Sequence, residues 1–307
     1  MRTRITNRLF PLVLSAVTAG VLSALAEPAV LQAERIAAKR GMPPTLKQLG
    51  DAGEPARRMV YKSIGERKLE LHIFEPAGHS SSNRSPCFVA IHGGGWVGGA
   101  PSRFYPFAAH FAKLGCVGVS VEYRLVKKGG DVTVFDCVKD GRSAIRYIRQ
   151  HAGELGIDPT KIIVSGGSAG GHVAAGTALF DGIDEAGEEV KVSCVPNALV
   201  LYFPVIDTST EGYGNARCGS RWQELSPLHR VKPGLPPTLI LHGTADTTTP
   251  FKGAKAFEEA MHRAGNRCEL IPHEGGKHGY LLAGPDVFKQ AMGQTEGFLK
   301  SIDLLGQ

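Results

Sequence analysis

The feature that most constrains this chain is the pentapeptide Gly166–Gly170, in which a glycine stands two residues before and two residues after Ser168. The apolar run Ile162–Val164 precedes it, and a run compatible with a helix follows it. A serine on so sharp a strand-to-helix turn has a strained backbone, so its neighbours must be small to avoid clashes. The N-terminus of the following helix favours negative charge that develops beside the serine. The pattern predicts a nucleophile elbow with Ser168 as the nucleophile.

A second glycine-rich turn, His92–Trp96, directly follows the apolar run Cys87–Ile91. Successive glycines allow backbone N–H groups to turn toward the carbonyl oxygen of a substrate, where such donors stabilise a developing oxyanion. The alternative is a phosphate-binding loop, but no G-K-[ST] follows and the spacing is not G-x-G-x-x-G. His92 itself is predicted to be a structural residue at the end of a strand.

A serine hydroxyl is a weak nucleophile that needs a base, and the base needs a carboxylate to orient it. Asp246 follows the apolar run Thr238–Leu241, and His278 lies in a glycine-rich loop after the run Glu269–Ile271. Both are expected at the carboxyl ends of parallel strands, where ligand crevices form. We therefore predict a catalytic triad of Ser168, Asp246 and His278.

Other residues compete for the acid and base roles. Asp207 also follows an apolar strand and is the alternative acid, although Asp246 is favoured. His273 lies within the last predicted strand, so its side chain is expected to be packed or exposed. His242 precedes a glycine turn and His172 lies just inside a helix, and both are predicted to be structural.

Short apolar strands that alternate with helices indicate an α/β fold with a parallel sheet covered on both faces. The predicted strands are Arg58–Ile64, Lys68–Phe74, Cys87–Ile91, Cys116–Val121, Ile162–Val164, Ala198–Phe203, Thr238–Leu241 and Glu269–Ile271, of which the first two form a hairpin. The predicted helices are Phe104–Lys113, Phe135–His151, Gly170–Phe180, Phe251–Arg263 and Val287–Ile302.

The chain divides into unequal parts. Three arginines in the first eight residues, an apolar run over 9–25 and an A-x-A-like site ending at Ala26 predict a cleaved signal peptide over residues 1–26. An uncleaved membrane anchor is the alternative, but the apolar run is slightly short to span a bilayer. Residues 27–56 are interpreted as a leader segment and 57–307 as the catalytic domain. The protein is therefore expected to be exported to the periplasm or the medium, with no stable membrane insertion after cleavage.

Within the predicted catalytic domain, residues 207–237 are rich in glycine and proline and carry no apolar strand pattern. An irregular segment of this length inside a compact domain is usually functional. We interpret it as a small lid-like insertion, with a disordered insert as the alternative.

Charge and cysteine content exclude several other functions. The net charge of +6 falls to +3 without the three arginines of the signal peptide, and no basic stripe with interleaved aromatic residues predicts nucleic-acid binding. The six cysteines contain no C-x-x-C pair, so we predict neither a metal site nor a metal cofactor. They are expected to be buried free thiols, although Cys218, in a loop, is a candidate for a disulfide.

Together these residues resemble the acetyl esterase/lipase branch of the α/β-hydrolase superfamily, close to the hormone-sensitive-lipase-like esterases. The resemblance runs from about Arg58 to the C-terminus. It rests on the motifs His92–Gly95, Glu122–Leu125, Gly166–Gly171, His242–Asp246 and His278–Gly279. It implies an eight-stranded, mostly parallel sheet. It also implies an oxyanion hole formed by the backbone N–H groups of Gly94, Gly95 and Ala169.

The sequence departs from the hormone-sensitive-lipase-like pattern at three places. Gly167 stands where many members have aspartate, Val126–Lys128 replaces the usual Ala-Pro-Glu, and the N-terminal region is short for a full helical cap. These departures favour the small secreted esterases, some of which deacylate plant polysaccharides.

The sequence therefore predicts a serine carboxylic ester hydrolase that acts through an acyl-enzyme and needs no cofactor. The expected partner is a small-molecule or carbohydrate ester with a short acyl chain, and Trp96 is predicted to line its binding site. One alternative is a serine exopeptidase of the prolyl-oligopeptidase type, which the lack of room for a propeller disfavours. The other is an inactive hydrolase-fold binding protein, which would require a lost triad member.

Overall fold

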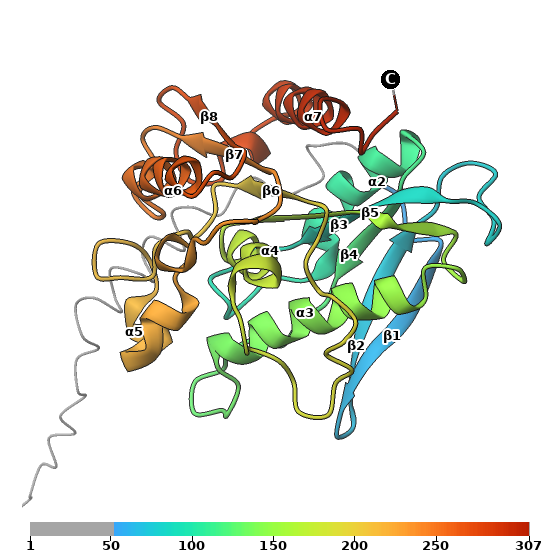
Figure 1. The fold of residues 1–307 in the computed structure, drawn as a ribbon, viewed down its shortest axis with the longest axis horizontal. Helices are drawn as coiled ribbons and strands as arrows, with labels where there is room; N and C mark the ends of the chain where they lie inside the picture. Colours follow the sequence, from blue (N-terminus) through green and yellow to red (C-terminus); the bar gives the residue numbers. More distant parts are fainter. Residues whose placement is uncertain (1–51, 307) are drawn as a thin grey trace, which may run out of the picture.

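The strands of this protein pair into one eight-stranded sheet with the order β1-β2-β4-β3-β5-β6-β7-β8 (Figure 1). The pairs β1/β2 and β2/β4 are antiparallel, and every other neighbouring pair is parallel. The strands are β1 (Arg57–Ile64), β2 (Arg67–Phe74), β3 (Ser85–Ile91), β4 (Val117–Val121), β5 (Ile157–Gly167), β6 (Ala198–Tyr202), β7 (Thr238–Gly243) and β8 (Cys268–His273). The predicted α/β class and the eight-stranded, mostly parallel sheet are confirmed.

The computed structural model describes residues 52–306. The predicted signal peptide and most of the leader segment therefore lie outside the described residues. No helix between residues 52 and 306 is long and apolar enough to cross a bilayer.

Helices cover both faces of the sheet because side chains on each strand alternate between two apolar clusters. In β3, Val89 packs into one cluster together with α3 (Val134–Gln150), α4 (Ala169–Leu179) and α6 (Phe251–Arg263). Phe88, the preceding residue, packs into the other cluster with α2 (Tyr105–Lys113) and α7 (Pro285–Lys300). The sheet is thus buried on both sides, which explains why its central strands are apolar throughout.

The strand β5 is longer than its predicted core, Ile162–Val164, at both ends. Its first residues include Asp158 and Pro159, which break the apolar pattern and are only partly buried. Its last two residues are glycines, whose intrinsic preference for a strand is low. They are held by pairing with β6, where Gly167 lies opposite Tyr202. This pairing carries the strand directly into the turn at Ser168.

The segment 207–237 has a defined structure of short helices. They are α5 (Asn215–Cys218), η3 (Gly219–Leu225) and η4 (Pro227–Arg230). The segment is tied to the elbow helix by His172, whose Nε2 lies 2.6 Å from the carbonyl oxygen of Leu225. It also packs on the second glycine-rich turn, because Gly214 lies against the Trp96 ring.

All six cysteines are buried and unpaired, as predicted for five of them. Cys218, the candidate for a disulfide, lies in α5 as a free thiol. Burial raises the pKa of Cys218 to about 12, so this thiol stays protonated and unreactive near neutral pH.

Candidate active site

The turn between β5 and α4 holds Ser168 in a strained conformation, with φ 55° and ψ −123°. The flanking glycines are required by close packing. A Cβ atom on Gly166 would lie 2.3 Å from the carbonyl oxygen of Gly170. A Cβ atom on Gly170 would lie 2.1 Å from the carbonyl oxygen of Ile91, at the end of β3. The local geometry is therefore that of a nucleophile elbow, as the pentapeptide predicts.

Side chains from two further loops, after β7 and after β8, form a continuous hydrogen-bonded chain with the elbow serine. His278 Nε2 lies 2.9 Å from Ser168 Oγ, and His278 Nδ1 lies 2.8 Å from Asp246 Oδ2. An ionised carboxylate only accepts hydrogen bonds, so Nδ1 carries the proton and donates a hydrogen bond to Asp246. Nε2 is then free to accept the hydroxyl proton of Ser168. The structure thus brings together the three residues predicted as nucleophile, base and acid.

The carboxylate of Asp246 is almost fully buried and is surrounded by donors. The backbone N–H groups of Thr248 and Thr249 each lie 2.9 Å from Oδ1, and the Thr249 hydroxyl lies 2.9 Å from Oδ2. Burial by itself opposes ionisation. The hydrogen bonds from His242, His278 and the Thr249 backbone outweigh it and hold the pKa of Asp246 well below its ordinary value. Asp246 is therefore a fixed negative charge facing the imidazole.

The competing residues lie elsewhere. Asp207 accepts hydrogen bonds from the backbone and hydroxyl of Ser209 at 2.8 and 2.9 Å, and not from His278. His273 is the last residue of β8 and stacks on Tyr280. His242 is buried, with Nε2 2.7 Å from the Thr249 carbonyl oxygen and 3.3 Å from Asp246 Oδ2. His242 therefore borders the acid, a contact that sequence reasoning missed.

Two buried histidines beside the elbow provide a pH-dependent prediction of stability. Burial lowers the pKa of His92 and of His172 to about 4, from an ordinary value of 6.5. As the pH falls from about 6.5 to about 4, the unfolded chain takes up these protons before the folded one does. Stability present above this window should be lost within it, by about 3 kcal/mol for each histidine. Urea unfolding at a series of pH values measures the loss.

The replacement His172→Gln keeps a donor for the Leu225 carbonyl and removes one of these titrating groups. We expect its free energy of unfolding to fall less steeply between about pH 6.5 and about pH 4 than that of the wild type. Identical slopes for the two proteins would exclude His172 as a source of the acid lability.

The glycine-rich turn after β3 lies directly against the elbow. A Cβ atom on Gly93 would lie 3.1 Å from Ser168 Cβ and 2.7 Å from the carbonyl oxygen of Gly167. Gly94 and Gly95 have φ values of 130° and 60°, which few residues with side chains adopt. This backbone path allows their N–H groups to face the serine.

The predicted oxyanion hole consists of the backbone N–H groups of Gly94 and Gly95, in this turn, and of Ala169, directly after Ser168. Ala169 is the first residue of α4, so its N–H has no partner within the helix. In the part of the chain that the structure describes, the N–H groups of Gly94, Gly95 and Ala169 donate to no backbone carbonyl. They are therefore available to bind an anionic oxygen formed beside Ser168.

Trp96, which was predicted to line the substrate site, is packed inside the protein. Its side chain is fully buried and packs edge-on to the ring of His172, with ring centroids 5.1 Å apart. Tyr213 and Gly214 lie against the indole, since a Cβ atom on Gly214 would lie 2.5 Å from its Cζ3. No part of the Trp96 ring is open to a substrate in this structure, so its role here is to support the glycine-rich turn.

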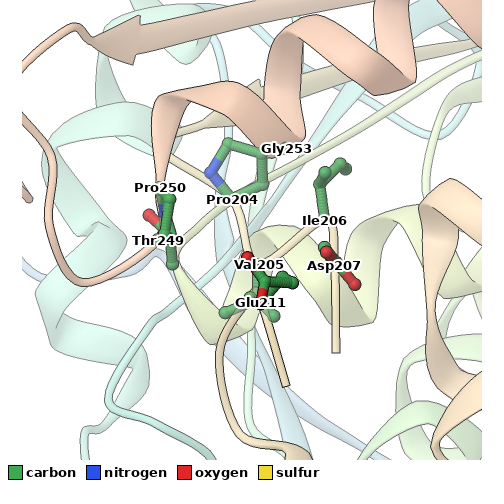
Figure 2. A pocket seen from close by; sticks show the side chains of 9 residues that line it. Pro204, Val205, Ile206, Asp207, Glu211, Thr249, Pro250 and Gly253 are labelled. Atoms are coloured by element: carbon green, nitrogen blue, oxygen red, sulfur yellow. The ribbon is translucent and has the colours of Figure 1, made fainter. Parts of the chain in front are cut away.

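A small pocket lies behind the acid loop, between the segment after β6 and the beginning of α6 (Figure 2). Its volume is about 10 Å³, far below that of a substrate site. Of the residues that line it, Thr249 contacts the side chains of Asp246 and His278, and Val205 contacts only the backbone of Ser168. We therefore do not assign this pocket to the substrate.

The structure adds Thr249 to the residues that surround the triad. The sequence contains a signal for it, because an aspartate followed by threonines often accepts hydrogen bonds from the backbone two and three residues ahead. Among residues 52–306, no cluster of three histidine, cysteine or acidic side chains is placed to hold a metal ion.

Comparisons with known proteins give a consistent family. A family model described as BD-FAE matches residues 71–213. The apo structure of Thermogutta terrifontis esterase 2 superposes with a TM-score of 0.78 at 40% identity, covering 82% of this chain and 96% of that one. The propionate-bound form of that esterase gives a TM-score of 0.77 at 39% identity, over 86% of this chain and 98% of that one.

Two curated relatives are less similar and longer. A probable isoprenylcysteine alpha-carbonyl methylesterase of Arabidopsis thaliana is 26% identical over 72% of this chain and 50% of its own length. The esterase LipQ of Mycobacterium tuberculosis is 29% identical over 66% of this chain and 51% of its own. The chain thus spans about half the length of these relatives.

Proposed function

The chain belongs to the esterases of the α/β-hydrolase superfamily, and from this premise we propose that it is a serine carboxylic ester hydrolase acting on short-chain acyl esters. The observation that carries the proposal is the hydrogen-bonded chain from Asp246 through His278 to Ser168. An aligned serine, base and acid beside available N–H donors is an arrangement suited to acyl transfer.

The first half of the proposed reaction acylates the enzyme. His278 Nε2 takes the hydroxyl proton as Ser168 Oγ attacks the ester carbonyl carbon. Asp246 keeps the proton on Nδ1 and stabilises the imidazolium that forms. The N–H groups of Gly94, Gly95 and Ala169 bind the oxyanion. The alcohol then leaves with the proton from Nε2, and the acyl group remains on Ser168.

The second half of the reaction repeats these steps with water. His278 removes a proton from the attacking water, the same donors bind the second oxyanion, and Ser168 leaves with the proton from His278. The products are a carboxylic acid and an alcohol. The residues named in these two steps suffice for the chemistry, so the proposed mechanism uses no cofactor.

A solved relative supports the proposal that the substrate carries a short acyl chain. Thermogutta terrifontis esterase 2 has been described with propionate and with butyrate bound, and also phosphorylated by paraoxon. The matching BD-FAE family includes carbohydrate esterases. We infer that acetylated carbohydrate is a candidate natural substrate and that paraoxon should phosphorylate Ser168.

A series of p-nitrophenyl esters, with acyl chains from about two to about twelve carbons, tests the substrate class. We expect kcat/KM to be highest for the shortest chains and to fall at least about tenfold toward the longest. Acetate release from acetylated xylan, measured in parallel, tests the carbohydrate assignment. A preference for the longest acyl chain would overturn the short-chain proposal.

The rival activities are separable by the same kind of assay. A prolyl-oligopeptidase-type exopeptidase should cleave a peptide amide faster than an acetyl ester, whereas an esterase should show the reverse. An inactive binding protein should hydrolyse neither. The intact hydrogen-bonded chain at Ser168 favours an active enzyme over this last reading.

We also propose that the protein is exported, on the basis of the signal-like residues 1–26. N-terminal sequencing of the mature protein tests this, and we expect its first residue to be Glu27. A mature chain that begins at Met1 would contradict it.

A further inference from the structure

Backbone strain is concentrated around the triad. Of the four non-glycine residues with positive φ between residues 52 and 306, three lie at the site, namely Trp96, Ser168 and Phe203. The strain at Ser168 belongs to the elbow, and that at Trp96 to the glycine-rich turn. Phe203, with φ 36°, directly follows β6 and has no part in the mechanism described above. A residue held in so unfavourable a conformation must be kept there by its surroundings.

Backbone hydrogen bonds join the residues on either side of Phe203 to Ser168. The Ser168 N–H donates to the carbonyl oxygen of Tyr202 at 3.0 Å, and the Val205 N–H donates to the carbonyl oxygen of Ser168 at 3.1 Å. The Phe203 N–H itself donates to the carbonyl oxygen of Leu241 in β7 at 2.7 Å. The chain on both sides of Phe203 therefore has little freedom to relax its φ angle.

The Phe203 ring contacts the base. It packs edge-on to the imidazole of His278, with centroids 5.1 Å apart and an interplanar angle of 76°. The phenyl ring is buried, and it occupies space that a side chain at position 167 would need. A Cβ atom on Gly167 would lie 3.1 Å from Phe203 Cζ and 2.6 Å from Phe104 Cζ.

Phe203 also reaches the acid, through Thr249. The Thr249 hydroxyl lies 3.3 Å from the Phe203 carbonyl oxygen, 2.9 Å from Asp246 Oδ2 and 3.1 Å from His278 Nδ1. The Thr249 hydroxyl is thus within hydrogen-bond distance of both Asp246 and the carbonyl oxygen of the strained residue. The segment after β6 thus contacts Ser168 and His278 directly and Asp246 through Thr249, while contributing no reacting group.

We propose that Phe203 is a positioning residue for the esterase reaction. Its strained backbone turns the phenyl ring onto His278, and the ring holds the imidazole in line between Ser168 and Asp246. Thr249 secures the same arrangement from the acid side. The inference rests on the proposed function, since it assigns Phe203 a role in aligning that triad.

The variant Phe203→Leu tests the role of the ring, with Phe104→Leu as its matched control. Both replace a buried phenylalanine that lies against Gly167, but Phe104 has its ring contact with Phe107 and not with His278. We expect Phe203→Leu to lower kcat for p-nitrophenyl acetate by about 10- to 100-fold with KM changed less than about threefold. Phe104→Leu should keep kcat within about threefold of the wild type. Equal kcat values for the two variants would overturn the proposal.

A spectroscopic readout separates alignment from catalysis. The low-field ¹H NMR signal of the His278 Nδ1 proton, which bridges to Asp246, should be sharp in the wild type and in Phe104→Leu. We expect it to be broadened or lost in Phe203→Leu. An unchanged signal in Phe203→Leu would show that the ring does not hold the imidazole. Because this signal needs no turnover, it tests positioning even if the wild type hydrolyses no ester, which would refute the proposed function instead.

Thr249 provides a second pair of variants in case Phe203→Leu does not fold, as judged by circular dichroism and thermal unfolding. Thr249→Ser keeps the hydroxyl and should retain kcat within about threefold, whereas Thr249→Val removes it and should lower kcat about tenfold or more. Equal kcat values for these two variants would contradict the proposed link between Phe203 and the acid.

Discussion

Replacing Ser168 with alanine should lower kcat/KM for p-nitrophenyl acetate by about 10⁴-fold or more. The alanine variant has no oxygen to attack the carbonyl carbon, so it forms no acyl-enzyme. Its oxyanion donors and binding contacts remain, which is why a small residual rate above the uncatalysed reaction is expected. The release of p-nitrophenol at substrate concentrations far below KM measures the effect.

Ser165→Ala is the matched control for this prediction. Ser165 lies on the same strand, but its hydroxyl donates to the carbonyl oxygen of Val89 at 2.9 Å. Losing that bond should cost about 1 kcal/mol of stability and leave kcat/KM within about threefold. A Ser168→Ala variant as active as Ser165→Ala would show that the ester is hydrolysed elsewhere.

Replacing Asp246 with asparagine should lower kcat by about 10³- to 10⁴-fold. The carboxylate accepts a hydrogen bond from the protonated Nδ1 of His278 at 2.8 Å. His278 Nε2 therefore carries no proton and is free to accept that of Ser168. An asparagine amide would instead donate to Nδ1 and favour the tautomer with the proton on Nε2. That tautomer cannot act as the base. The buried negative charge that stabilises the imidazolium would be lost as well.

Asp207→Asn provides the comparison, because Asp207 is the other carboxylate that follows a strand near the site. Its oxygens bind Ser209 rather than His278, so kcat should stay within about threefold of the wild type. Full activity in Asp246→Asn together with a large loss in Asp207→Asn would reverse the assignment of the acid.

The fold was largely predictable from local pattern. Short apolar strands between glycine-rich turns favour a parallel sheet covered on both faces, and six of the eight strands pair in parallel. The boundaries of β5 were less predictable, because pairing with neighbouring strands holds polar residues and glycines that have little strand preference of their own.

The candidate site was predictable where a motif carries its own geometry. Ser168, Asp246 and His278 each stand in a turn after a strand, and a parallel sheet brings such turns to one edge. Contacts between distant segments were not predictable in this way. The burial of Trp96 depends on the packing of residues 213–214. The contact of Phe203 with His278 depends on the positive φ angle of Phe203, which no local sequence pattern predicts.

The measurement that tests the central claim most directly is the site of phosphorylation by paraoxon. The protein is treated with increasing amounts of paraoxon, assayed for ester hydrolysis, digested, and mapped by mass spectrometry. We predict one diethylphosphoryl group per chain, on Ser168, with activity falling in proportion to the modified fraction. Hydrolysis that persists in fully modified protein, or an adduct at another residue that accounts for the loss of activity, would contradict the assignment of Ser168 as the nucleophile.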